Sequence, residues 1–338
     1  MFIARWDLDK TYLRTDFDTL RDLVRTAFER PDQKRTVPGA AALMRELADA
    51  EVEIHILSGS PEQLRGRVAE KLALDGVRYA SLTLKPNLQN LLRLRLRAVR
   101  GQLGYKLTAL LRRRCELPQR TDERGELVRE ALLGDDAEAD AFVYSLYADV
   151  CAGTVSPSEL EAVMRAGGCY DDDIKDAQRL ASYLERGPTV ERILIHLERQ
   201  SAPSAFDDYG PRVVPFYNYL QAAFVLYDDG RLSARAVLRI AQDLAVRHHF
   251  DGAALARSYF ELARRGHLSL RGLDALESSF AAWLAHRRIA GDSELAVMVA
   301  DLVRDAAELP APPPKAPHVI DYRRQVEAHN PRRTKRHP

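Results

Sequence analysis

Apolar runs and helical patterns alternate along roughly the first 155 residues of the chain. Short apolar runs bounded by polar turns are typical of buried strands, whereas apolar residues three and four positions apart are typical of helices. The pattern predicts strands at Phe2–Asp7, Val52–Leu57, Tyr79–Leu84 and Glu130–Leu133, with Asp149–Cys151 as a fifth candidate. It predicts helices near 18–30, 39–50, 61–74, 104–115 and 137–147, while 88–100 fits either structure. Strands that alternate with helices form βαβ units, so we expect an α/β domain with a mostly parallel sheet.

Beyond about residue 155 the strand pattern ends, and the chain is expected to be helical. Three junctions in this part share one pattern: a Gly that can end a helix in the left-handed conformation, followed by a Ser that can cap the next helix. They are GTVS at 153–156, GRLS at 230–233 and GHLS at 266–269. Their unequal spacing argues against a repeat architecture.

The C-terminal segment differs in composition from the rest of the chain. PAPPPKAP at 310–317 cannot be helical and reads as an extended linker, and the chain ends in the basic stretch RRTKRHP. We interpret that end as a disordered, solubilising tail in preference to a nucleic-acid-binding arm. The expected domains are an α/β domain at 1–155, an all-α domain at 156–309, and a linker and tail at 310–338.

The composition is that of a soluble globular protein, with 46% hydrophobic and 29% charged residues. No uninterrupted apolar run approaches the ~20 residues needed to span a bilayer. Asp7 and Asp9 interrupt the first apolar run, so the N-terminus does not fit a signal peptide. Three cysteines without a C-x-x-C pair fit reduced thiols, and we expect a cytoplasmic protein.

Polar side chains follow the predicted strands. Asp7, Asp9 and Thr11 follow the first strand, SGSPEQ follows the second, and GDDAEAD, with Asp135, Asp136 and Asp140, follows Glu130–Leu133. The carboxyl ends of parallel strands share one edge, where ligands bind. Carboxylates two residues apart on a strand repel each other unless a cation or proton lies between them, although the first stretch taken alone favours an ordinary polar turn.

These motifs together resemble the haloacid dehalogenase superfamily of phosphatases. The resemblance covers about residues 1–155 and rests on DLDKT for D-x-D-x-T, then Ser58, Lys106 and GDDAEAD, in that order. ILSGSPEQL and LLGDDAEADAFVY are similar to the phosphatidate phosphatase branch of the actin-patch type. The chain departs from that branch by one extra residue before Asp140, by Asp136 in place of a Ser, by Lys10 within D-x-D-x-T, and by Tyr105 where a His is usual.

The resemblance implies a three-layer, Rossmann-like α/β fold and a Mg²⁺-dependent reaction on a phosphate ester. It implies that Asp7 attacks phosphorus, Asp9 transfers protons, Ser58 binds a phosphoryl oxygen and Lys106 offsets charge. Alone, Lys106 reads as a surface lysine. The implied Mg²⁺ ligands are the side chains of Asp7 and Asp135 and the backbone carbonyl of Asp9, supported by Asp136 or Asp140. We assign Thr11 and Gly59 to substrate binding, and Ser60 to a helix-capping box with Gln63.

The expected activity is therefore a Mg²⁺-dependent phosphomonoester hydrolase with an aspartyl-phosphate intermediate. The alternatives are a phosphotransferase, or a helical interaction protein with a catalytically retired α/β domain and a protein partner. Only about 50 residues separate Asp7 from Ser58, too few for a large cap domain. Nucleic acid is not an expected partner.

The charge distribution bears on the substrate. Residues 85–114 hold nine basic residues and no acidic one, while the whole chain carries +1, which leaves −8 for the rest. Such a segment can dock a phospholipid surface or another polyanion, with Arg93, Arg95 and Arg97 at the contact. It can equally be a basic surface that pairs with the acidic helical part of the chain.

Overall fold

The computed structural model describes residues 1–13, 36–85, 99–269, 271–286, 290–309 and 318–329. Six strands form one sheet: β1 (Phe2–Asp7), β2 (Glu53–Pro61), β3 (Ser81–Lys85), β4 (Arg129–Asp135), β5 (Val190–His196) and β6 (Val213–Phe216). The strand order is β3-β2-β1-β4-β5-β6, and all pairs are parallel. The predicted α/β fold with a parallel sheet is confirmed.

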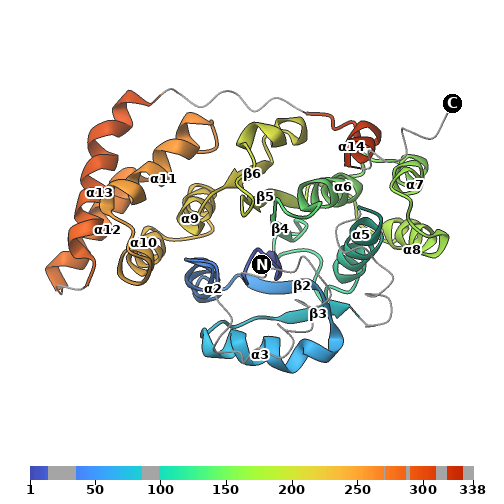
Figure 1. The fold of residues 1–338 in the computed structure, drawn as a ribbon, viewed down its shortest axis with the longest axis horizontal. Helices are drawn as coiled ribbons and strands as arrows, with labels where there is room; N and C mark the ends of the chain where they lie inside the picture. Colours follow the sequence, from blue (N-terminus) through green and yellow to red (C-terminus); the bar gives the residue numbers. More distant parts are fainter. Residues whose placement is uncertain (14–35, 86–98, 270, 287–289, 310–317, 330–338) are drawn as a thin grey trace.

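Helices cover both faces of this sheet (Figure 1). The helices are α2 (Ala40–Asp49), α3 (Arg65–Leu74), α5 (Val99–Cys115), α6 (Asp140–Ala152), α7 (Pro157–Ala166), α8 (Asp171–Ser182), α9 (Tyr219–Asp228), α10 (Ala234–His248), α11 (Gly252–Arg264), α12 (Leu273–His286), α13 (Asp292–Asp305) and α14 (Tyr322–His329). Short 3₁₀ turns lie at η2 (Glu62–Leu64), η3 (Pro203–Tyr209) and η4 (Ala306–Glu308). The predicted helix at 18–30 lies outside the described residues.

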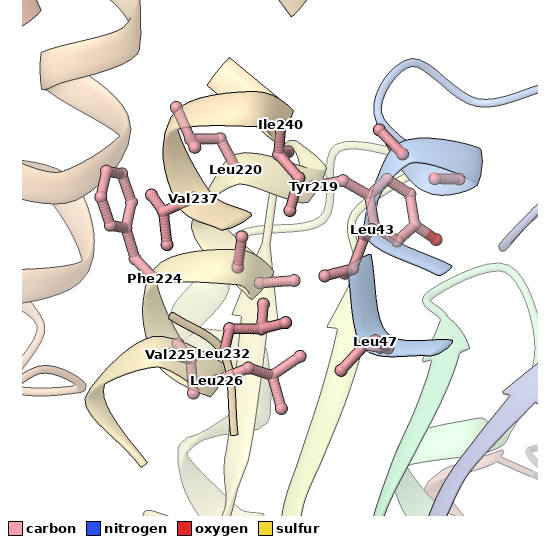
Figure 2. Close-up of a cluster of buried hydrophobic side chains, with 14 of the residues drawn as sticks. Leu43, Leu47, Tyr219, Leu220, Phe224, Val225, Leu226, Leu232, Val237 and Ile240 are labelled. Carbon is pink, nitrogen blue, oxygen red and sulfur yellow. The ribbon is translucent and has the colours of Figure 1, made fainter. Parts of the chain in front are cut away.

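The two large hydrophobic clusters show how the layers divide. Alternate residues of a strand face opposite sides of a sheet, and in β1 the apolar side chains of Phe2, Ala4 and Trp6 all join one cluster. That cluster contains α2, α3 and α9 to α13. The other face of the sheet carries α5 to α8 and α14. Figure 2 shows part of the first cluster, where Leu43 and Leu47 of α2 face side chains of α9 and α10.

The prediction that strands end before residue 155 is wrong. β5 and β6 extend the sheet beyond β4, so a boundary at residue 155 would divide one continuous sheet. Asp149–Cys151, the fifth candidate strand, instead forms the last turn of α6. That helix is buried along almost its whole length, so its sequence lacks the polar face by which a surface helix is recognised.

The tail is also more ordered than predicted. Residues 318–329 of the expected disordered segment are described, and α14 packs against α6 and α7. Ile320, Tyr322 and Val326 are buried there, and the Tyr322 hydroxyl donates to the Asp149 carboxylate at 2.6 Å. Residues 310–317 and 330–338 lie outside the described residues.

At the three Gly–Ser junctions, every Gly has the predicted left-handed conformation, and two of the three Ser residues cap the next helix as predicted. Gly153, Gly230 and Gly266 have φ values of +81°, +72° and +74°. Ser156 and Ser233 accept the expected hydrogen bonds from backbone N–H groups of the following helices. Ser269 instead donates its hydroxyl to Asp228, so it ties two helical segments together rather than capping α12.

Candidate active site

The candidate site lies at the carboxyl ends of β1, β2 and β4, three adjacent strands. Asp7 ends β1 and pairs with Leu57 of β2, which places Ser58 one residue further along that edge. Asp135 ends β4 on the other side of β1, and Lys106 reaches the edge from α5. The chain thus brings the four motifs together from positions as far apart as 7 and 140.

Lys106 is surrounded by carboxylates. Its Nζ lies 3.2 Å from Asp7 Oδ1, 2.7 Å from Glu138 Oε2 and 2.5 Å from Asp140 Oδ1. Burial alone would lower the pKa of Lys106, but these carboxylates outweigh it and raise that pKa well above its ordinary value. The raised pKa favours the charged ammonium, which balances only one of three neighbouring carboxylates.

Asp7 is the least satisfied group of the site. It is 1% exposed, and neither of its oxygens accepts a hydrogen bond from the described residues. Burial first, and then repulsion from Asp140 and Glu138, raises the pKa of Asp7 well above its ordinary value despite the attraction of Lys106. A buried carboxylate without donors is costly unless it meets a cation or a proton.

Asp9 is held by two serines at the end of β2. Ser58 Oγ donates to Asp9 Oδ2 at 2.9 Å, and Ser60 Oγ donates to the same oxygen at 3.2 Å. Burial raises the pKa of Asp9, and these hydrogen bonds only partly oppose it. Asp9 is thus positioned to carry a proton closer to neutral pH than an ordinary carboxyl group.

The assignment of Ser60 to a capping box is wrong. The first helical turn here is η2, its N-cap residue is Pro61, and no side chain caps it. Ser60 instead bonds to Asp9, and its backbone N–H donates to Ser58 Oγ at 2.9 Å. Between the two serines, Gly59 has open space on the side where a Cβ would lie.

The GDDAEAD segment separates its acidic residues. Asp135 Oδ1 accepts the backbone N–H groups of Ala137 and Glu138, while Oδ2 lies 3.4 Å from the hydroxyl of Thr11. Asp140 enters the Lys106 cluster, and a side chain at Gly134 would collide with it.

Asp136 lies away from that cluster. Its carboxylate accepts the backbone N–H groups of Arg199 at 2.8 Å and Ser201 at 3.1 Å, so it holds the loop after β5. Of the two residues predicted to support a metal, Asp140 therefore lies at the site.

The turn after β1 is held by residues that sequence reasoning did not assign to the site. The Tyr219 hydroxyl donates to the Thr11 carbonyl, and His196 Nδ1 lies 3.3 Å from the Lys10 carbonyl. The Tyr219 ring stacks on Trp6 at 5.6 Å between centroids. Lys10 has a φ of +59°, an uncommon conformation for a residue other than Gly. No local signal marks Tyr219 or His196, because they meet this turn only through the fold.

Glu138 was also missed, although it lies within the quoted motif. Its carboxylate joins Asp7 and Asp140 in a group whose ligand oxygens all lie within 4.8 Å of one another. Its position three residues after Asp135, in the turn that follows β4, is the signal that could have identified it.

The described part of the basic segment is largely paired with acidic residues. Arg112 lies 3.5 Å from Asp176 of α8, and Arg114 is buried 3.8 Å from Glu130. The Arg112–Asp176 pair agrees with the interpretation of a basic surface that meets acidic helices, whereas Arg114 pairs inside the protein with a residue of β4. Arg93, Arg95 and Arg97 lie outside the described residues, so their role in docking a polyanion stays a prediction.

Asp7, Glu138 and Asp140 could together hold a metal ion. When all are ionised, Asp7, Glu138 and Asp140 carry three negative charges against the single charge of Lys106, an excess of two. Carboxylate oxygens are the ligands that Mg²⁺ prefers, and both oxygens of Asp7 lack a hydrogen-bond donor among the described residues. This group differs from the ligand set implied by the resemblance, in which Asp9 and Asp135 accompany Asp7.

Comparison of the sequence with protein-family models and with curated proteins finds no match. Within the described ranges, no helix is both long and apolar enough to cross a membrane.

Proposed function

We propose that the protein is a Mg²⁺-dependent phosphomonoester hydrolase in which Asp7 is the nucleophile. The observation that carries the proposal is the Asp7 carboxylate, which is buried, accepts no hydrogen bond from the described part of the chain and lies 3.2 Å from the Lys106 ammonium. A free carboxylate oxygen beside a fixed positive charge is suited to attack an electrophile that brings further negative charge. Asp7, Asp140 and Glu138, with Asp135 nearby, would hold Mg²⁺. The ion would neutralise charge between Asp7 and the phosphate ester.

In the first step an Asp7 oxygen bonds to phosphorus while the bond to the ester oxygen breaks. Asp9 gives its proton to the leaving alkoxide, a role that suits its raised pKa. While Asp9 is protonated it can donate to Ser58 Oγ, which leaves the Ser58 hydroxyl hydrogen free for a phosphoryl oxygen.

In the second step water attacks phosphorus and the bond to Asp7 breaks. Asp9, now ionised, accepts the proton of that water, so the enzyme returns to its initial state. Lys106 lies close enough to Asp7 to offset charge on the transferred group in both steps. Expulsion of a halide needs no proton donor, so the presence of Asp9 supports phosphate ester cleavage over dehalogenation.

The proposal is tested by phosphate release from an aryl phosphate in Mg²⁺ and in a chelator. We expect turnover only in Mg²⁺, and a loss of at least about 10³-fold in kcat for Asp7→Asn. Asp136→Asn is the matched control, because it is the same substitution at an aspartate that lies outside the Lys106 cluster, and it should retain most activity. Undiminished hydrolysis by Asp7→Asn would overturn the proposal.

A further inference from the structure

Lys85 lies at the same edge of the sheet as the candidate site. It is the last residue of β3 and pairs with Pro61 of β2, directly after the Ser58–Ser60 stretch that holds Asp9. β3 is two strands from β1, so at a strand spacing of about 4.8 Å the ends of these strands are about 10 Å apart. A molecule with its phosphate group at Asp7 can therefore extend to Lys85.

The Lys85 ammonium lies over the ring of Tyr105. Its Nζ lies 5.2 Å from the centroid of the Tyr105 ring, within cation–π range. The Tyr105 hydroxyl donates to the Ser58 carbonyl at 3.1 Å, so this ring lies between Lys85 and the serine loop. Tyr105 also directly precedes Lys106, which ties both lysines to one short segment of α5.

Among the residues that the structure describes, the ammonium of Lys85 has no close counterion. The buried lysines Lys71 and Lys106 are both paired, Lys71 with Asp75 at 2.7 Å and Lys106 with the three carboxylates. Lys85 is half-buried, and the described carboxylates that act on it, Asp173 and Glu138, do so from beyond ion-pair distance. Burial lowers the pKa of Lys85, and the more distant carboxylates of Asp173 and Glu138 oppose this only in part.

We infer that Lys85 and Tyr105 form a second anion-binding site beside the phosphate site. The substrate is then a phosphate ester that carries another anionic group, with an apolar or aromatic spacer against Tyr105. A partly desolvated cation without a counterion binds an anion more strongly than a fully hydrated one does. This inference rests on the proposed function for the placement of the phosphate group.

The test uses three aryl phosphates: phenyl phosphate, 4-carboxyphenyl phosphate and 4-carbamoylphenyl phosphate. The last two differ in the charge of the para group, and the change of their kcat/KM ratio between the wild-type protein and the Lys85 variants isolates recognition of the second anion, because the leaving-group difference is the same in every variant. For the wild-type protein in Mg²⁺ we expect a ratio of about tenfold in favour of the carboxylate. Lys85→Gln should bring the ratio close to one without lowering kcat/KM for the carbamoyl compound, and Lys85→Arg should restore part of it.

Lys175→Gln is the control, because it removes the same charge from an exposed position on α8. It should leave the ratio unchanged. A wild-type ratio near one, or an equal loss on both substrates in Lys85→Gln, would overturn the inference.

If the wild-type protein hydrolyses none of the three compounds, the proposed function is wrong. The same comparison is then made by calorimetry, as the ratio of Kd values for the intact carboxy and carbamoyl compounds. A carboxylate preference that Lys85→Gln removes supports the second anion site without the hydrolase activity, and equal Kd values contradict it.

Discussion

At the scale of single residues, the site is built around a carboxylate that costs stability. Asp7 is buried without a hydrogen-bond donor among the described residues, and its pKa is raised mainly by burial. A folded chain pays such a cost where it serves binding or catalysis. Removal of the charge at Asp7 should therefore stabilise the metal-free protein while it removes activity.

We predict that Asp7→Asn is more stable than the wild-type protein in a chelator, and increasingly so as the pH rises. An acid whose pKa is raised by folding keeps its proton in the folded chain at pH values where the unfolded chain has lost it. Its contribution to stability is present below the unfolded-state pKa of about 3.8 and is lost as the pH rises through the folded-state pKa. Asn has no proton to lose, and each unit of raised pKa corresponds to about 1.4 kcal/mol.

The measurement is the free energy of unfolding in denaturant for both proteins between pH 4 and pH 8. Added Mg²⁺ should stabilise the wild-type protein and have little effect on Asp7→Asn. If the difference in the free energy of unfolding between the two proteins does not change with pH, burial does not raise the pKa of Asp7 and the prediction is wrong.

Sequence reasoning could predict the main residues of the site but not all of their contacts. Asp7, Asp9, Ser58 and Lys106 stand in motifs with a known order, so their meeting could be expected once the sheet was assumed to be parallel. The roles of Ser60 and Glu138 depend on which way a turn directs its side chains. SPEQ fits a capping box as well as it fits a loop that binds Asp9, and only the backbone geometry distinguishes the two.

At the scale of elements, β5 and α9 support the turn that carries Asp9. Tyr219 begins α9, stacks on Trp6 and bonds to the Thr11 carbonyl, while His196 ends β5 near the Lys10 carbonyl. The turn adopts a left-handed conformation at Lys10, which has to be maintained by its surroundings. We therefore regard Tyr219 as a positioning residue for the Asp9 loop.

We predict that Tyr219→Phe lowers kcat by about three- to tenfold with little change in KM, because the ring remains but the loop loses its hydrogen bond. The loss of stability should be about 1 kcal/mol. The matched control is Tyr209→Phe, since the buried Tyr209 hydroxyl has no hydrogen-bond partner in the described structure. Equal kinetic effects of the two substitutions would contradict a positioning role for Tyr219.

The elements that sequence reasoning missed share a physical cause. β5 is buried on both faces, so it reads as an apolar run that fits a buried helix as well as a strand. β6 has only four residues and contains Pro215, which argues against a strand in isolation. The last turn of α6 shows the opposite error, because Asp149–Cys151 is helical where a strand was predicted. A helix that is buried on all sides has no polar face to reveal its period.

At the scale of the whole molecule, the later half of the chain completes the α/β body. β5 and β6 cover the edge of β4, and α9 to α13 pack on the face of the sheet that also carries α2. Beyond α13, α14 lies on the opposite face against α6 and α7 (Figure 1). The expected separation at residue 155 therefore fails because the sheet and both hydrophobic clusters continue past it.

We predict that a fragment of residues 1–155 does not fold cooperatively. It would expose the edge of β4 and the apolar face that α9 and α10 cover, and it would lack Tyr219. The measurement is urea unfolding followed by near-ultraviolet circular dichroism, with the chain ending at residue 329 as the control. A cooperative unfolding transition of the fragment would show that residues 1–155 fold on their own, and it would contradict this prediction.

The most direct test of the proposed mechanism is to trap the phosphoryl group on Asp7. Asp9→Asn should still accept phosphate from 4-nitrophenyl phosphate, whose leaving group needs little protonation, but it should be slow to activate water for the second step. Acid quenching in Mg²⁺ followed by peptide mass spectrometry should then find a phosphoryl group on Asp7, in nearly the same amount as the first burst of nitrophenol. A burst of nitrophenol with a phosphoryl group on another residue, or on none, would contradict the account.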